Sequence, residues 1–431
     1  MSTVAFYTLG CKVNQYETEA MSALFLQAGY QLVPFDGPSD VYVINTCTVT
    51  GTSDQKSRQI IRRARRHNPN AVVAVVGCYA QVAPEDIQKI GGVNVILGTA
   101  DRGKIVEYVQ QAKQRTATYV TDALAHREYE ELWVTSYHNK ARALVKIEEG
   151  CNEYCSYCMI PYARGPVRSR PLESIRQEVT ALAENGYSEI VLTGIHIASY
   201  GRDGIGHTLL DVIHTICQIG GIRRIRLGSL EPRLLTKDFV TKLSSIPQVC
   251  PHFHLSLQSG CDSTLQRMNR KYTTAQYRQN VALLRQYYDN PAVTTDIMVG
   301  FPGETEADFE CSLAFLKEIA FAEAHVFAYS PRKGTRAAAM PGQIAKHEKE
   351  RRAKLMADAA KQCRAKYLES CAGKQAEVFV EREVSPGVWE GHTPNYIPVQ
   401  IKCDSDLNHQ YKNVVLEISP HNGMIGIPAI S

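Results

Sequence analysis

Long apolar runs are missing from this sequence, and so is any strong excess of charge. No stretch of about eighteen apolar residues occurs, which argues against a transmembrane helix. The start, MSTVAFYTLG, has no basic segment followed by a long apolar stretch, so we see no secretory signal. The net charge of +4 over 431 residues is only a mild lean towards polyanionic partners. We therefore expect a cytoplasmic protein without a membrane partner.

The cysteine pattern of a small disulfide-stapled domain is also missing. The sequence has 13 cysteines, which is an odd number, and cytoplasmic proteins rarely keep disulfides. In a reducing compartment, clustered cysteines more often bind metals or iron–sulfur clusters. The cysteines without ligand-like spacing, which we interpret as structural, are Cys217, Cys250, Cys261, Cys311, Cys363, Cys371 and Cys403.

The length of 431 residues is too great for one core and predicts two or three domains. Within residues 1–115, short β-rich apolar runs at 4–9, 41–46 and 71–76 alternate with helical segments. This alternation predicts a doubly wound α/β domain. Residues 112–140 are polar and weakly periodic, and we interpret them as a linker that has room for a hairpin.

A second series of strands and helices fills residues 137–367. Its strand candidates are ALVKIEEG, EIVLTG, RIRLGSLE, HFHLSLQ, TTDIMVGFPG and AHVFAYS. About six such units predict a partial (β/α) barrel of parallel strands. A charged amphipathic helix over 343–370 leads onward, and short strands with turn residues over 370–431 predict a small β-barrel. The expected fold class is α/β in three domains.

Three cysteines lie close together in the segment CNEYCSYC, directly after the first strand of the second series. Cys151, Cys155 and Cys158 can bind only three irons of a cubane 4Fe–4S cluster, which leaves one iron open. An open iron can chelate S-adenosylmethionine (SAM), and reductive cleavage of SAM gives a 5′-deoxyadenosyl radical. A zinc site would want four ligands, usually in CxxC pairs, and no second pair follows. The spacing therefore favours a radical-SAM cluster over zinc or buried structural thiols.

The other half of this site is expected on later strands, because active sites of (β/α) barrels lie at the C-terminal ends of strands. Ordinary turn chemistry explains each single position equally well, above all in the segment GFPGE. The positions expected to meet SAM are Gly194, Ser229, Glu231, Gln258 and Gly300.

Three further cysteines are far apart in the sequence but share one placement. Cys11, Cys47 and Cys78 each follow a predicted parallel strand, in YTLGC, VINTC and VVGC. The C-terminal ends of neighbouring strands in a doubly wound sheet open onto one crevice. A single buried cysteine is common as a small apolar side chain, but three with the same placement predict a second, auxiliary 4Fe–4S cluster. A structural zinc ion on these thiols is the alternative.

These motifs together resemble the methylthiotransferase family of radical-SAM enzymes. The resemblance rests on TLGCKVNQYETE, NTCTVT, VVGCYAQ, CNEYCSYCMIPYARGPVRSR, LTGIHIASYG, LSLQSG and DIMVGFPGET, and it covers nearly the whole chain. It implies an N-terminal methylthiotransferase domain, a radical-SAM domain and a C-terminal TRAM barrel. The start LGCKVNQYE is most similar to the MtaB branch, which acts on N6-threonylcarbamoyladenosine next to the tRNA anticodon.

The resemblance implies two 4Fe–4S clusters, SAM, a tRNA substrate rather than DNA, and an electron donor. The radical made at the central cluster would abstract hydrogen from C2 of the adenine, and the auxiliary cluster would hold or supply the sulfur. A second SAM would then methylate that sulfur. Within the family, isopentenyladenosine in tRNA and a ribosomal-protein aspartate are the alternative substrates. A non-catalytic iron–sulfur RNA-binding protein is the alternative of another class.

Basic and aromatic residues near the cluster loop are the RNA-binding candidates, namely Arg164, Arg168 and Arg170, with Tyr157 and Tyr162 for stacking on a base. Arginine could equally clamp SAM or pack the barrel. A basic helix around 58–66 could also contact phosphates. Residues 372–431 have four Lys and Arg against seven Asp and Glu, which does not support RNA binding by charge. Exposed residues of this segment would then have to make the RNA contacts, and we expect these to be Trp389, His392, Asn395 and Tyr396.

Overall fold

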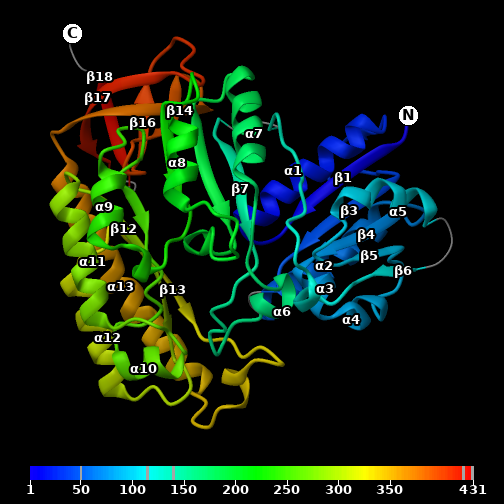
Figure 1. Cartoon of the computed structure of the whole chain (residues 1–431), viewed down its shortest axis with the longest axis horizontal. Coiled ribbons are helices and arrows are strands. Elements are labelled where there is room, and N and C mark those ends of the chain that lie inside the picture. Colours follow the sequence, from blue (N-terminus) through cyan, green and yellow to red (C-terminus); the bar gives the residue numbers. More distant parts are fainter. Residues whose placement is uncertain (49–50, 113–115, 138–140, 420–422, 429–431) are drawn as a thin grey trace.

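The computed structural model describes residues 1–48, 51–112, 116–137, 141–419 and 423–428 (Figure 1). Apolar β-branched runs form two groups of parallel strands, and the chain ends in a closed antiparallel barrel with one parallel pair. The predicted α/β class and the small C-terminal barrel are confirmed. Within the described residues, no helix combines the length and apolar character needed to cross a membrane.

The N-terminal sheet is parallel, with strand order β2-β1-β3-β4-β5-β6. Its strands are β1 (Thr3–Thr8), β2 (Gln31–Leu32), β3 (Val41–Thr46), β4 (Val72–Gly77), β5 (Val95–Leu97) and β6 (Ala117–Tyr119). Its helices are α1 (Lys12–Gln27), α2 (Gly51–His67), α3 (Cys78–Val82), α4 (Pro84–Gln88) and α5 (Ile105–Gln111). β3 and β4 are almost fully buried, as expected for central strands covered by helices on both faces.

The central unit has six parallel strands in the order β7, β9, β10, β11, β12 and β13, with short β8 antiparallel to β7 at one edge. The strands are β7 (Ala143–Glu149), β8 (Arg168–Ser169), β9 (Glu189–Gly194), β10 (Arg224–Leu227), β11 (His252–His254), β12 (Ala292–Val299) and β13 (Glu323–Ala328). Its helices are α6 (Ile160–Arg164), α7 (Leu172–Glu184), α8 (Leu209–Cys217), α9 (Lys237–Ser244), α10 (Asp262–Arg267), α11 (Thr274–Tyr287), α12 (Glu306–Ile319) and α13 (Lys346–Cys371). The expected partial barrel of six units is confirmed.

The C-terminal barrel closes in the order β14-β15-β16-β18-β17. Its strands are β14 (Gln375–Ser385), β15 (Val388–His392), β16 (Pro398–Lys402), β17 (Tyr411–Ile418) and β18 (Met424–Pro428). In Figure 1 this barrel and the N-terminal sheet contact different sides of the central unit, and α6 reaches out beside α3. The largest apolar core lies inside the central unit, between its strands and their helices.

Two expectations about segments are wrong. The segment 112–140 is not a linker with a hairpin: β6 adds to the N-terminal sheet in parallel with β5, and Leu132 and Val134 are buried in the central core. Residues 113–115 and 138–140 lie outside the described part of this segment. In the C-terminal barrel, Trp389 is 7% exposed and donates its indole N–H to the carbonyl of Cys403, so it packs in the core instead of facing solvent.

Candidate active site

The three N-terminal thiols lie at one edge of the sheet, because β1, β3 and β4 are neighbours that run in parallel. Cys11 precedes α1, Cys47 directly follows β3, and Cys78 is the first residue of α3. Cys47 and Cys78 are buried, whereas Cys11 is exposed. The structure therefore brings together the three loops that the sequence placed at strand ends.

Gly10 lets the first two of these loops approach. Its φ is +113°, and a β-carbon built on it would lie 2.8 Å from Cβ and 3.2 Å from Sγ of Cys47. Any side chain at this position would push the loops of Cys11 and Cys47 apart. The pKa of Cys78 rises to about 12 through burial, with Arg164 lowering it and Cys47 and Cys11 raising it further, so the three thiols share one electrostatic environment.

The central thiols lie on the loop between β7 and α6. The amide of Cys151 donates to the carbonyl of Gly165 (3.0 Å), and the amide of Cys158 donates to the carbonyl of Cys155 (3.0 Å). A terminal guanidinium nitrogen of Arg270 donates to Sγ of Cys155 over 3.3 Å. Burial and the charge of Cys155 raise the pKa of Cys158 to about 12.

Each set offers three thiols, which is the donor set of a cubane cluster with one open iron. Among the described residues, no three His, Cys, Asp or Glu side chains form a group suited to a single metal ion. A cubane cluster does not require three side chains to converge on one metal ion, because each thiol binds an iron at a different corner. Burial that favours neutral thiols also implies that cluster binding must displace their protons.

Arg164 links the two sets. Its side chain is fully buried, and its Nε donates to Sγ of Cys78 over 3.1 Å. Its terminal nitrogens donate to Oδ1 of Asn14 (2.8 Å), to Glu17 and to Oε1 of Glu149 (3.0 Å), two residues before Cys151. The thiol of Cys78 also contributes to the raised pKa of Cys158, so the two sets lie near one another.

The expectation that the three arginines after the cluster loop face RNA needs correction, because all of them are buried. Arg164 is 0%, Arg168 4% and Arg170 0% exposed. Arg168 donates to the carbonyls of Arg164 and Pro166, and Arg170 pairs with Glu178. A buried charge is retained where partners satisfy it, and here these partners hold the cluster loop in place.

One cavity touches the loops of both thiol sets. It has a volume of about 270 Å³, and its wall is mostly apolar. Thr48, which follows Cys47, lines one side, and Tyr157 and Cys158 of the central loop line another. The remaining wall comes from β12, β13 and the segments beside them: Met159, Ile160, Gln258, Asp296, Met298, Phe327, Ala328, Tyr329 and Ser330.

The residues expected to meet SAM divide into two groups. Gly194, Ser229, Glu231 and Gln258 follow the C-terminal ends of successive strands, on the side of the barrel that carries the central cysteines. A β-carbon on Gly194 would lie 2.9 Å from Oε2 of Glu148, so backbone and carboxylate are in close contact there.

Gln258 has a φ of +68° and lines the cavity described above. Gly300 has a different environment. A β-carbon on it would lie 2.4 Å from Cγ of Lys349 on α13, and its amide donates to Glu304 (3.0 Å). Its position fits a tight turn that packs against a helix, with φ of +71°.

Three buried polar atoms near the barrel mouth lack a partner in the described part of the chain, and two of them, on Glu148 and His196, belong to residues that were not expected from the sequence. Oε1 of Glu148, Nε2 of His196 and Oε2 of Glu231 have no hydrogen-bond partner among the described residues. Buried polar atoms are nearly always paired, so unpaired ones near a site indicate a missing ligand. SAM presents an ammonium group, a carboxylate and ribose hydroxyls, which this mixture of acceptors and a ring nitrogen fits. Glu231 was among the predicted residues, whereas the signal for Glu148 and His196 was their position at strand ends, in KIEEG and LTGIH.

Two family models match the chain. Residues 3–98 match the Uncharacterized protein family UPF0004, and residues 145–316 match the Radical SAM superfamily. Among solved structures, the chain resembles the radical SAM methyltransferase TsrM from Kitasatospora setae, with a TM-score of 0.58 and 14% identity. That match covers 90% of this chain and 81% of TsrM, and at this identity it shows the fold alone.

Curated relatives match over nearly the full length. The chain is 41% identical over 94% of its length to threonylcarbamoyladenosine tRNA methylthiotransferase MtaB of Bacillus subtilis (strain 168), of which 92% is covered. It is 35% identical over 92% of its length to the protein of the same name from Thermotoga maritima, of which 91% is covered. A tRNA-2-methylthio-N(6)-dimethylallyladenosine synthase of Moorella thermoacetica is 35% identical over 88% of this chain, with 87% of that protein covered. With both halves of the site on family-matched segments, the chain belongs to the methylthiotransferase family of radical-SAM enzymes, in its MtaB branch.

Proposed function

We propose that this protein inserts a methylthio group at C2 of N6-threonylcarbamoyladenosine in tRNA, next to the anticodon. The observation that carries the proposal is a cavity that is lined by both Thr48 and Cys158. A reacting base must meet the radical source and the sulfur at one place, and this cavity lies against the loops of both thiol sets. MtaB relatives named for this reaction support the choice of nucleoside.

Radical-SAM enzymes use a 4Fe–4S cluster and SAM, and MtaB-type methylthiotransferases carry two clusters. We assign the SAM-binding cluster to Cys151, Cys155 and Cys158. The auxiliary cluster belongs to Cys11, Cys47 and Cys78. When bound, the clusters and SAM would supply hydrogen abstraction from an inert C–H bond, the inserted sulfur and its methyl group.

The chain's own residues position these groups and keep water away. Tyr157, Met298 and Phe327 give the cavity an apolar wall, which protects a radical from side reactions with solvent. Asp296 is one of its polar members and supplies hydrogen-bonding groups for the edge of a base. We assign Gly194, Ser229, Glu231 and Gln258 to the SAM side of the site.

RNA contacts follow from surfaces beside the cavity. Tyr154 on the central loop and Tyr162 on α6 are 42% and 43% exposed and are free to stack on a base. α2 starts three residues beyond Thr48 and presents exposed Arg62 and Arg66 for phosphate contacts. We further propose that the substrate is tRNA and that an electron donor reduces the clusters. The proposed location is cytoplasmic.

Mass spectrometry of tRNA nucleosides tests the proposal, with and without this protein in a cell that lacks the activity. We expect conversion of threonylcarbamoyladenosine to its 2-methylthio form. Conversion of isopentenyladenosine instead would overturn the choice of nucleoside but keep the enzyme class. No change in any nucleoside would overturn the tRNA substrate and direct the search to ribosomal proteins.

Cysteine variants test the division of labour between the two sets. Cys155→Ala should abolish SAM cleavage, because the open-iron cluster would lose one of its three ligands. Cys47→Ala should retain cleavage but stop sulfur insertion, as measured by release of 5′-deoxyadenosine against formation of the 2-methylthio nucleoside. Cys217→Ala, outside both sets, is the control. Unimpaired thiolation by Cys47→Ala, or zinc with half the iron on elemental analysis, would exclude the auxiliary cluster.

A further inference from the structure

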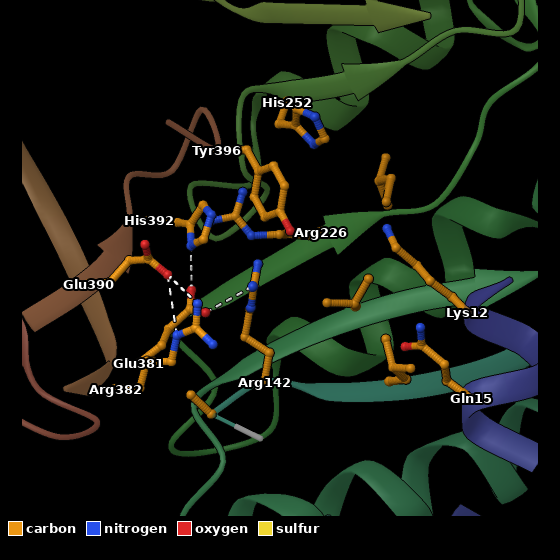
Figure 2. A pocket seen from close by; sticks show the side chains of 14 residues that line it. Lys12, Gln15, Arg142, Arg226, His252, Glu381, Arg382, Glu390, His392 and Tyr396 are labelled. Carbon is orange, nitrogen blue, oxygen red and sulfur yellow. Dashed lines mark hydrogen bonds and ion pairs between the residues drawn. The ribbon is translucent and has the colours of Figure 1, made fainter. Parts of the chain in front are cut away.

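A second cavity lies where the three parts of the chain meet, and no cysteine lines it, although Lys12 directly follows Cys11. Its volume is about 390 Å³. Lys12 and Gln15 of α1 line one side, and the C-terminal barrel lines the other with Glu381, His392 and Tyr396 (Figure 2). Its floor includes Arg142, directly before β7, and His252, the first residue of β11, so it lies at the N-terminal ends of the barrel strands.

Three cationic side chains face this cavity from three separate elements. Figure 2 shows that Lys12, Arg142 and Arg226 line it together. Arg226 is 2% exposed and donates to the carbonyls of Thr393 and Pro394, so it contributes positive charge and no free donor. Among the described residues, the ammonium group of Lys12 has no hydrogen bond or ion pair. Because this ammonium group has no carboxylate partner, it can bind an anion that enters the cavity from outside.

The carboxylates near the cavity are already shared among several cations. Glu189 pairs with Arg226 (2.5 Å) and also lies 3.5 Å from Arg224 and 3.8 Å from Arg142. Glu381 pairs with both Arg142 (3.0 Å) and His392 (2.7 Å). Cations therefore outnumber carboxylates around the cavity, and the excess positive charge lies on its inner wall.

The rim and the aromatic residues limit the kind of ligand. Arg382 and Glu390 at the rim pair with each other over 2.7 Å and cancel in charge. The ring of Tyr396 stacks on His392 with centroids 4.5 Å apart and lies 4.9 Å from the ring of His252. Because His392 and His252 already contact the ring of Tyr396, this ring has little room to stack on a base. The cavity therefore favours a ligand that is recognised by its charge.

We propose that this cavity binds a phosphate group. A guanidinium group matches phosphate oxygens in geometry, and Glu381 holds Arg142 in place before any ligand arrives. Lys12 supplies an ammonium group without a partner among the described residues, and Arg226 adds its positive charge from the wall. The phosphate belongs either to a free phosphorylated anion or to the backbone of the RNA substrate. This site goes beyond the proposed function, because it uses neither thiol set and its occupancy does not require catalysis.

Calorimetric titration of inorganic pyrophosphate into the cluster-loaded protein tests the site. We expect saturable binding that Lys12→Met weakens by at least about tenfold, since one charge-assisted contact is lost. Gln15→Glu, which adds a negative charge on the same wall without removing a contact, should weaken binding as well. Lys89→Met removes an exposed lysine of the same domain and should leave binding unchanged. Iron content of each variant shows that the nearby thiols still hold their cluster.

Titration of tRNA at several salt concentrations separates the two sources of phosphate. If RNA supplies it, pyrophosphate displaces tRNA, and Lys12→Met lowers the salt dependence of tRNA affinity by about one phosphate contact. If a free anion supplies it, tRNA affinity is the same in Lys12→Met and in the wild type, while pyrophosphate binding is weakened. The proposal is overturned by an absence of saturable pyrophosphate binding, or by equal binding in the wild type, Lys12→Met and Gln15→Glu.

Discussion

At the scale of single residues, Gly10 controls how closely the first two N-terminal thiols approach. A β-carbon on Gly10 would lie 2.8 Å from that of Cys47, and the φ of +113° disfavours any other residue. We expect Gly10→Ala to displace Cys11 from Cys47 and to lower bound iron from about eight towards about four atoms per chain. Iron and sulfide analysis after reconstitution measures this change, and SAM cleavage at the central loop should persist.

Gly29→Ala is the matched control for this variant. Gly29 also has a left-handed backbone, with φ of +84°, but a β-carbon there would have no neighbour within 4 Å. The control therefore shares the backbone strain without the steric conflict, and it should bind iron like the wild type. A full complement of iron in Gly10→Ala would show that the two loops do not need this contact.

The cysteines of both sets could be identified from the sequence. The residues that surround them and hold them in place could not. The cysteines are spaced along strands and a loop, so local pattern was enough to group them. Arg164 was ambiguous, because its partners Asn14 and Glu17 lie about 150 residues earlier in the chain. No local rule predicts such a contact, and the burial that excludes RNA binding follows only from the packing of α6 against the N-terminal sheet.

At the scale of elements, length and periodicity decided which predictions were right. The run 41–46 is recovered as β3 with the expected bounds, because a buried apolar strand between helical segments has a strong local signal. β6 has only three residues, and only pairing with β5 identifies it as a strand. Trp389 of the C-terminal barrel was expected at the surface, but it packs in the core of that barrel.

Docking of the C-terminal barrel depends on β10. Arg224 is 4% exposed and donates to the carbonyls of His392 (3.1 Å) and Glu377 (2.7 Å). Arg224→Met keeps the length of the side chain but leaves both carbonyls without this donor, which should cost about 1–3 kcal/mol. We expect faster proteolytic cleavage between α13 and β14, measured by time-resolved limited proteolysis.

Arg223→Met is the control for the docking prediction. The side chain of Arg223 is 52% exposed and pairs with Glu377 at the surface, where an ion pair contributes little. Its loss should leave the cleavage rate close to that of the wild type. Equal acceleration by both variants would mean that general charge at the start of β10, and not the buried contacts, holds the barrel.

At the scale of the whole molecule, one buried ionic network joins the N-terminal sheet to the central barrel. Glu17 on α1 is fully buried and pairs with Arg102 from its own domain and with Lys146 and Arg164 from the central unit. Removing one partner from such a network is costly, because the remaining charges stay buried. Ion pairs between residues other than the cysteines thus hold the two thiol sets close to each other.

Acidic pH should weaken this contact between the N-terminal sheet and the central barrel. Burial alone would raise the pKa of Glu17, but Arg102, Arg164 and Lys146 outweigh it and lower the pKa from 4.5 to about 2. A lowered folded-state pKa gives stability that is present above pH 4.5 and is lost as the pH falls towards 2. The full effect is on the order of 3 kcal/mol.

Glu17→Gln should therefore lower the free energy of unfolding near pH 6 and flatten its pH dependence below pH 4.5, where protonation of Glu17 no longer contributes. Urea unfolding of the cluster-free chain, followed by circular dichroism at several pH values, measures this, since acid also dissolves iron–sulfur clusters. Glu128→Gln, at an exposed position of the segment before β7, is the control and should follow the wild-type curve. If Glu17→Gln keeps the wild-type slope between pH 4.5 and 2, other carboxylates carry the acid sensitivity, and Glu17 does not hold the two halves of the active site together.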